Sequence, residues 1–207
     1  MAVPEPRRLL PSPLTKRWFV LRHGRSEANE AGIVASQLAH AETRYDLVAA
    51  GREEVAASVR AAADAVNEAP PLLILASPFL RTRRTAEIAG GIFGVEPAID
   101  ARLSERDFGD FELQSADHYA EVWAADAKAD VTLPGRAEPI AAVAARSAEL
   151  VREVEAREDL ATCLLVTHCD TAMALAAVFA GVDPHHHRSF DPAGPIATGE
   201  LRRLRQA

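Results

Sequence analysis

Positively charged and imidazole side chains follow three short apolar segments of the chain, each close to the point where the segment ends. Arg22 and His23 follow WFVL, Arg81 comes soon after LLILA, and His168 comes just after CLLV. A neutral imidazole can act as a nucleophile near pH 7, and guanidinium groups bind the oxygens of a phosphoryl group. If the fold brings these side chains together, they form a site for a phosphate-sized anion.

The three apolar segments are expected to lie in one parallel sheet. Residues 18–21, 72–76 and 163–166 are continuously apolar rather than alternating, which is typical of strands covered on both faces. In open parallel sheets, ligands bind beyond the carboxyl ends of the strands. The polar residues that follow the three segments therefore meet at one rim, where helix N-termini add N–H donors.

Amphipathic helical patterns separate these segments. Helices are predicted in four ranges, which are 51–69, 85–91, 140–157 and 170–181. Strands that alternate with helices predict an α/β fold with a mainly parallel central sheet. A final edge strand is predicted at 200–204.

The chain is interpreted as a single domain over residues 1–207. A chain this long buries roughly 70% of its unfolded surface, so it needs no disulfide or metal to fold. Residues 1–16 contain four prolines but no apolar core of a signal peptide, and we expect them to form a flexible leader. Residues 104–135 are less regular, with one predicted helix near 118–129, and are interpreted as an insertion or lid over the sheet edge.

The composition argues against two classes of partner. Hydrophobic residues make up 48% of the sequence and charged residues 26%, as in ordinary globular proteins. The formal net charge of -7 argues against nucleic acid, because affinity for a polyanion depends on positive charge. No apolar run approaches the roughly 18 residues of a membrane span. We therefore expect neither a nucleic-acid partner nor a membrane partner.

The two cysteines, Cys163 and Cys169, are expected to remain free thiols. In an extended segment they would lie roughly 20 Å apart, whereas a disulfide needs Cα atoms within about 7 Å of each other. Unpaired thiols suit a reducing compartment, so we expect a cytoplasmic protein.

Four segments of the chain, in this order, resemble the histidine phosphatase superfamily, the phosphoglycerate-mutase-like family. They are LRHGRSEAN, ASPFLRTRRTAE, LSERDFGDFE and VTHCDT. A single RHG motif is modest evidence, but four motifs in the family's order are specific. The resemblance covers about residues 17–204. It implies a three-layer α/β/α fold and a metal-independent phosphatase, without a cofactor, that hydrolyses a phosphomonoester.

The resemblance also implies a catalytic set. His23 would be the nucleophile that carries a phosphohistidine, and Arg22, Arg81 and His168 would clamp the phosphoryl oxygens. Preorganised cationic donors stabilise the charge that these oxygens carry in the transition state. Glu105 would donate a proton to the leaving group. As a residue of a highly charged loop, Glu105 could instead be a solvated surface side chain, but the motif LSERDFG favours the catalytic role.

Further substrate-binding candidates lie next to this set. Asn29 matches the asparagine that closes the RHG motif, and Ser26 belongs to the same segment, RHGRSEAN. Cys169 follows His168 directly and could approach the phosphate. Three adjacent histidines at 185–187 could chelate a metal, but no set of Asp, Glu or Cys at ligand spacing accompanies them, so we predict no metal site.

Two alternatives to a phosphatase stay open. A mutase of the same family would grip a sugar-acid carboxylate with basic residues in the insertion, yet residues 110–135 are acidic and Lys128 is their only basic residue. A phosphate-binding module without turnover is the other alternative. Because all five residues of the predicted catalytic set are intact, hydrolysis is the favoured function.

The sequence leaves the substrate and the assembly undefined. The phosphorylated partner could be a small molecule, such as a sugar phosphate, a phosphoglycerate-like acid or a nucleotide, or it could be a phosphoprotein. The oligomeric state, including a homodimer, is equally open.

Overall fold

A five-stranded, mainly parallel sheet forms the centre of the protein. The structure is a computed structural model that describes residues 9–128 and 132–206. The strands are β1 (Arg17–Arg22), β2 (Leu72–Ala76), β3 (Ala98–Ile99), β4 (Thr162–Thr167) and β5 (Leu201–Leu204). Their order is β3-β2-β4-β1-β5, and only β5 runs antiparallel to its neighbour. The predicted mainly parallel sheet is thereby confirmed.

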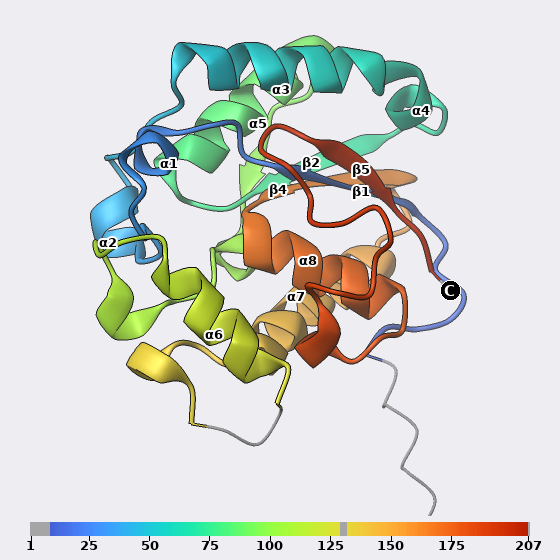
Figure 1. Cartoon of the computed structure of the whole chain (residues 1–207). Helices are drawn as coiled ribbons and strands as arrows, with labels where there is room; N and C mark the ends of the chain where they lie inside the picture. The colour runs from blue at the N-terminus through green and yellow to red at the C-terminus, as the bar shows by residue number, and fades with distance from the viewer. Residues whose placement is uncertain (1–8, 129–131, 207) are drawn as a thin grey trace, which may run out of the picture.

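Helices cover both faces of this sheet (Figure 1). One face carries α3 (Ala49–Ala61), α4 (Ala63–Asn67) and α5 (Leu80–Phe93), and the other carries α7 (Ile140–Glu155) and α8 (Cys169–Phe179). The described part of the chain contains no helix that is both long and apolar enough to cross a membrane. The three-layer α/β/α architecture agrees with the prediction.

Alternating side chains of β1, β2 and β4 enter two separate cores. Trp18 and Val20 of β1 pack with α7 and α8, whereas Phe19 and Leu21 pack with α3 and α5. All residues of β4 are buried. Full burial of one large aliphatic or aromatic side chain contributes about 1.5–3 kcal/mol, so the middle of a strand buried on both faces is continuously apolar. The two threonines at the ends of β4 are buried with their hydroxyls donating to the carbonyls of Ala69 and Leu103.

The sheet topology brings the ends of β1 and β4 together. The connection from β1 to β2 passes over β4, which lies between them, and ligands bind at such a switch in strand order. Arg22 pairs with Thr167 in the parallel register, and the His23 N–H donates to the Thr167 carbonyl over 2.9 Å. His23 and His168 therefore emerge from neighbouring strands at the same level.

Smaller helices gather near the carboxyl ends of the strands. They are α1 (Glu27–Ala31), α2 (Leu38–Ala41) and α6 (His118–Asp126), and α6 lies in the segment that was expected to be an insertion (Figure 1). Phe108 and Val122 of this segment pack with Val34 in a small third core. The predicted insertion, 104–135, includes residues 129–131, which lie outside the described part of the chain.

Several elements differ from the sequence prediction in extent. The helix predicted at 51–69 is interrupted at Ala62, where α3 ends and α4 begins. The helix predicted at 85–91 is longer, because α5 begins at Leu80 and is capped by left-handed Gly94. β3 was not predicted, since a strand of two residues is too short to show a pattern in the sequence.

The N-terminal segment also differs from the expectation of a flexible leader. Residues 1–8 of that leader lie outside the described residues. Leu10 is only 7% exposed and belongs to the core that includes α7. The Leu9 carbonyl accepts a hydrogen bond from Arg152, and Thr15 donates to Glu155 through its backbone and its hydroxyl. Residues 9–16 are thus packed on the domain.

Candidate active site

Two buried histidines form the centre of the candidate site. His23 follows β1 and is 3% exposed, and His168 follows β4 and is fully buried. Their ring centroids lie 5.2 Å apart in an edge-to-face arrangement. Because β1 and β4 are adjacent parallel strands, the backbone alone fixes this proximity.

The backbone fixes the tautomer of His23. Its Nδ1 lies 2.8 Å from the carbonyl oxygen of Gly24, which can only accept, so Nδ1 carries the hydrogen and Nε2 keeps its lone pair. Burial, together with the charges of Arg81 and Arg22, holds the pKa of His23 well below its ordinary range. The imidazole is therefore neutral at pH 7, with Nε2 available as a nucleophile.

Arg81 lies directly against that nucleophilic atom. Its side chain is 4% exposed, and its Nε donates to His23 Nε2 over 3.2 Å. Its Nη2 donates to the carbonyl of Ala35 over 2.8 Å, whereas Nη1 is buried without a partner among the described residues. The early start of α5 at Leu80 is what places Arg81 here.

Arg22 and His168 add further buried groups that lack partners. Arg22 Nη1 donates to the carbonyl of Ile196 over 2.9 Å, and its Nε has no partner in the described structure. His168 Nε2 lies 2.8 Å from the hydroxyl of Ser77, and His168 Nδ1 has no hydrogen-bond partner among the residues that the structure describes. Buried polar groups are normally hydrogen-bonded. Such a concentration of unsatisfied nitrogens around His23 is suited to an anion with several acceptor oxygens.

Glu105 lies at the N-terminus of α8. Its Oε2 accepts from the backbone N–H of Cys169 over 3.1 Å, and its Oε1 accepts from the N–H of Thr171 over 3.3 Å and that of Arg106 over 3.0 Å. These donors favour the carboxylate. Burial and the negative charge of Asp170 act more strongly in the other direction and raise the pKa of Glu105. The side chain can therefore hold a proton at a pH where a surface glutamate has lost it.

The three other candidate binding residues lie on either side of this centre. Asn29 Oδ1 accepts from the N–H and the hydroxyl of Ser26, each over 3.0 Å, which leaves the Asn29 amide nitrogen for another acceptor. Cys169 Sγ accepts a hydrogen bond from Arg188 Nη1 over 3.0 Å. Burial raises the pKa of the Cys169 thiol, so the sulfur is protonated near neutral pH and is a poor nucleophile.

A cavity of about 100 Å³ connects these side chains. It is lined by seven of the eight sequence-predicted site residues, namely Arg22, His23, Ser26, Asn29, Arg81, Glu105 and Cys169. The eighth, His168, is not a lining residue, but its ring lies edge-to-face with the ring of His23. The structure thus brings the whole predicted set together, from segments distant in the chain.

Sequence reasoning missed one wall of this cavity. Tyr119 and Trp123 of α6 line it, and their rings stack with centroids 5.5 Å apart. Their spacing of four residues in HYAEVW was a signal for a shared helix face. Asp170 also lines the cavity and accepts from Trp123 Nε1 over 3.0 Å, a contact between distant segments that no local pattern reveals.

A buried ion pair supports this wall from behind. Arg106 is fully buried, and its guanidinium donates to both carboxylate oxygens of Asp126 over 2.6 and 2.8 Å. A third contact, of 3.3 Å, joins Arg106 Nη1 to Asp170. Fully buried charges require such partners, so Arg106 is committed to holding α6 against α8.

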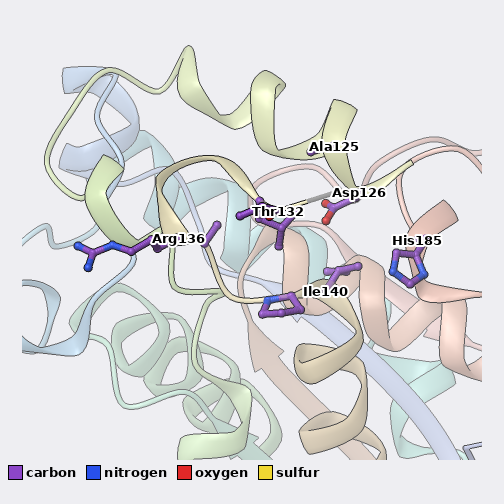
Figure 2. Close-up of a pocket in the computed structure, with 9 residues that line it drawn as sticks. Ala125, Asp126, Thr132, Arg136, Ile140 and His185 are labelled. Carbon is purple, nitrogen blue, oxygen red and sulfur yellow. The ribbon is translucent and has the colours of Figure 1, made fainter. Parts of the chain in front are cut away.

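A larger hollow lies between the C-terminal end of α6 and the first residue of α7, and does not belong to this centre. Figure 2 shows that Asp126, Thr132, Ile140 and His185 surround it, and its volume is about 420 Å³. Two of its polar side chains already have partners, since Asp126 binds Arg106 and His185 Nδ1 lies 2.7 Å from Asp183. No group of three His, Cys, Asp or Glu in the described parts of the chain could hold a metal ion.

Two buried histidines and two arginines at the carboxyl edge of an α/β sheet form a site suited to a phosphoryl group. The chain belongs to the histidine phosphatase superfamily, because a model of this superfamily (branch 1) matches residues 18–204. The predictions of this family, of the α/β fold and of a phosphatase are confirmed.

Several known proteins are similar to this one over most of the chain. The glucosyl-3-phosphoglycerate phosphatase of Mycolicibacterium vanbaalenii is 32% identical over 181 residues, which cover 81% of this chain and 75% of the relative. The structure of a mycobacterial glucosyl-3-phosphoglycerate phosphatase complexed with VO3 is 26% identical, with a TM-score of 0.72 over 91% of this chain and 92% of the other. A putative alpha-ribazole-5'-P phosphatase from Escherichia coli, 20% identical, shares the fold with a TM-score of 0.67 over 91% of this chain and 89% of its own.

Proposed function

We propose that the protein hydrolyses a phosphomonoester in two steps, with His23 as the nucleophile. The observation that carries this proposal is the neutral, backbone-fixed imidazole whose Nε2 contacts Arg81. Arg22 and His168 contribute further unsatisfied nitrogens beside it. Together these groups supply a nucleophile and the donors that a phosphoryl group needs.

In the first step, the lone pair of His23 Nε2 attacks phosphorus and the bond from phosphorus to the ester oxygen breaks. The raised pKa of Glu105 allows its carboxyl to give a proton to the departing oxygen. The imidazole then carries a positive charge, which the Gly24 carbonyl stabilises through the Nδ1–H. Arg22, Arg81 and His168 hold the three equatorial oxygens as their charge shifts.

In the second step, water attacks the phosphohistidine. Glu105, now ionised, takes a proton from the water as its oxygen bonds to phosphorus. The bond between phosphorus and Nε2 breaks, its electron pair returns to the imidazole, and inorganic phosphate leaves. The site is restored without a further reactant, since Glu105 has regained its proton.

The substrate is proposed to be a small phosphate ester rather than a phosphoprotein. The cavity of about 100 Å³ is well below the roughly 300–1,000 Å³ of pockets that enclose a whole small molecule. It accommodates the phosphoryl group, and the remainder of the ester lies toward Tyr119 and Trp123. The relatives that are named glucosyl-3-phosphoglycerate phosphatases support a phosphorylated sugar acid.

We also place the enzyme in a reducing cytoplasm. Cys163 and Cys169 are both free in the structure, and Cys163 is buried within β4. Neither thiol contributes to stability through a disulfide, as expected for a reducing compartment. Separation of cytoplasm from envelope, followed by immunodetection, tests this location.

The direct test is hydrolysis of p-nitrophenyl phosphate in EDTA. The wild type should release p-nitrophenol, and His23→Ala should lose nearly all of this activity. His185→Ala is the matched control, because His185 contacts Asp183 and does not line this cavity. This variant should retain the activity of the wild type. Equal activity in the wild type and His23→Ala would refute the proposal.

A further inference from the structure

The mouth of the cavity must hold the part of the substrate that the cavity cannot enclose. The space beside His23 is about 100 Å³. Trp123, Cys169 and Asp170 are among the residues that line this space, whereas Arg188 is not. The side chain that contacts all three of these residues is Arg188, which belongs to the loop between α8 and β5.

Arg188 is held rigidly at this wall. Its Cζ lies 3.9 Å from the centroid of the Trp123 ring, a close cation–π contact, and its Nη1 donates to Cys169 Sγ over 3.0 Å. The side chain keeps 23% of its surface exposed. A stacked guanidinium loses little further freedom when it binds a ligand, so the group is preorganised.

The charge of Arg188 is only weakly compensated. A thiol sulfur is a weak acceptor, and Asp170 Oδ1 lies 3.6 Å from Nη1. Asp170 is itself engaged by Arg106 and by Trp123 Nε1. Among the residues that the structure describes, the one hydrogen bond that Arg188 donates from its side chain is that of Nη1 to Cys169, so Nε and Nη2 remain for a ligand. By contrast, Arg106 donates to Asp126 through both Nη atoms and to the Glu138 carbonyl through Nε.

On the basis of the proposed function, we propose that Arg188 forms a second anion subsite, which binds a carboxylate on the leaving group of the substrate. The planar fork of a guanidinium matches a carboxylate with two parallel N–H···O bonds. Asp170 is close enough to repel a second phosphate dianion more strongly than a carboxylate monoanion. The subsite comes from the loop between α8 and β5, whereas residues 110–135 contain one basic residue, Lys128.

A pair of substrates that differ in one group tests this subsite. 3-Phosphoglycerate carries a carboxylate where glycerol 3-phosphate carries a hydroxymethyl group, and both release a primary alkoxide. The wild type should have the higher kcat/KM for 3-phosphoglycerate. Arg188→Gln should reduce the ratio of the two kcat/KM values roughly tenfold or more, mainly through KM, because it removes a charge-assisted hydrogen bond. Arg188→Lys should give an intermediate ratio.

The control is Arg157→Gln, which removes the same charge at a site where the guanidinium binds Asp159, and it should keep the wild-type ratio. The inhibition constants of the two esters against p-nitrophenyl phosphate hydrolysis give the same comparison without turnover of either ester. A ratio unaffected by Arg188→Gln in both measurements, or a wild type without preference for the carboxylate, would overturn the subsite. Failure of the phosphatase proposal is distinguishable, because the wild type would then not hydrolyse p-nitrophenyl phosphate at all.

Discussion

The Nε of Arg81 lies 3.2 Å from the Nε2 of His23 and donates a hydrogen bond to it. The atom that is proposed to attack phosphorus therefore rests against the guanidinium that is proposed to bind the phosphoryl oxygens. This contact is compatible only with a neutral ring that keeps its lone pair at Nε2. When a phosphoryl group enters, its oxygens can replace this lone pair as the acceptor, which releases Nε2 for attack.

Substitution of Arg81 should affect turnover more than stability. Arg81→Lys keeps a positive charge but loses the fork that reaches His23 and the Ala35 carbonyl together. Loss of one preorganised donor at a reacting oxyanion typically costs about 10²–10³ in kcat, and we expect a fall of this size. Steady-state kinetics with p-nitrophenyl phosphate measure it. Arg84→Lys, on the exposed side of the same helix, should behave as the wild type, and a similar loss there would argue against a specific role for Arg81.

Glu105→Gln should make the rate depend strongly on the leaving group. An alkoxide must be protonated as it departs, whereas p-nitrophenolate leaves readily without a proton. We expect kcat/KM to fall about 10²–10⁴-fold for an alkyl phosphate and less than about tenfold for p-nitrophenyl phosphate. The wild type should lose activity on alkyl phosphates as the pH rises through the raised pKa of Glu105. Equal losses with the two esters in Glu105→Gln would contradict the role of proton donor.

The close approach of Gly24 and Gly51 is needed for the position of His23. A Cβ on Gly24 would lie 2.4 Å from the Gly51 carbonyl oxygen and 2.8 Å from Val55 Cγ2. Gly24→Ala should therefore cost about 1–3 kcal/mol of unfolding free energy and displace the carbonyl that fixes the tautomer of His23. Denaturant unfolding and kcat should both report the change. Gly91→Ala, in α5 with open space around its Cβ, should be neutral or stabilising by about 0.5–1 kcal/mol.

His168 should make the protein less stable in acid. Burial and the charge of Arg81 lower the pKa of His168 well below its ordinary value in the folded state. Below about pH 6.5, the unfolded chain therefore binds a proton that the folded chain does not, and the stability falls by up to about 1.4 kcal/mol per pH unit for this group. Above about pH 6.5 the imidazole is neutral in both states, so this loss of stability does not arise. His168→Gln should show a smaller decline in unfolding free energy between pH 6.5 and 5, and an unchanged decline would refute this explanation.

The main strands could be predicted because burial on both faces leaves an unambiguous pattern. Each residue of β4 is buried, so CLLV is continuously apolar, and the same reasoning found β1 and β2. The edge strand β5 was predicted at its correct place, whereas the two residues of β3 are too few to show such a pattern. The first turn of α5 was missed because Arg81 is polar, although it is buried for its contact with His23.

The centre of the site could be predicted because its residues follow strand ends that share one edge. His23 and His168 needed only the parallel sheet to be placed together. The outer wall could not be predicted in this way. Trp123, Asp170 and Arg188 come from α6, α8 and the last loop, and their contacts depend on how these segments pack. No residue pattern within any one segment records those contacts.

The most direct measurement is the position of the phosphoryl group during turnover. Glu105→Gln should be mixed with p-nitrophenyl phosphate, quenched in alkali and digested, and the modified residue should be located by tandem mass spectrometry. With the second step slowed, phosphate should be found on the imidazole of His23, and the double variant His23→Ala/Glu105→Gln should carry none. Release of p-nitrophenol with the phosphate on another residue, or with His23 unmodified throughout, would contradict the account.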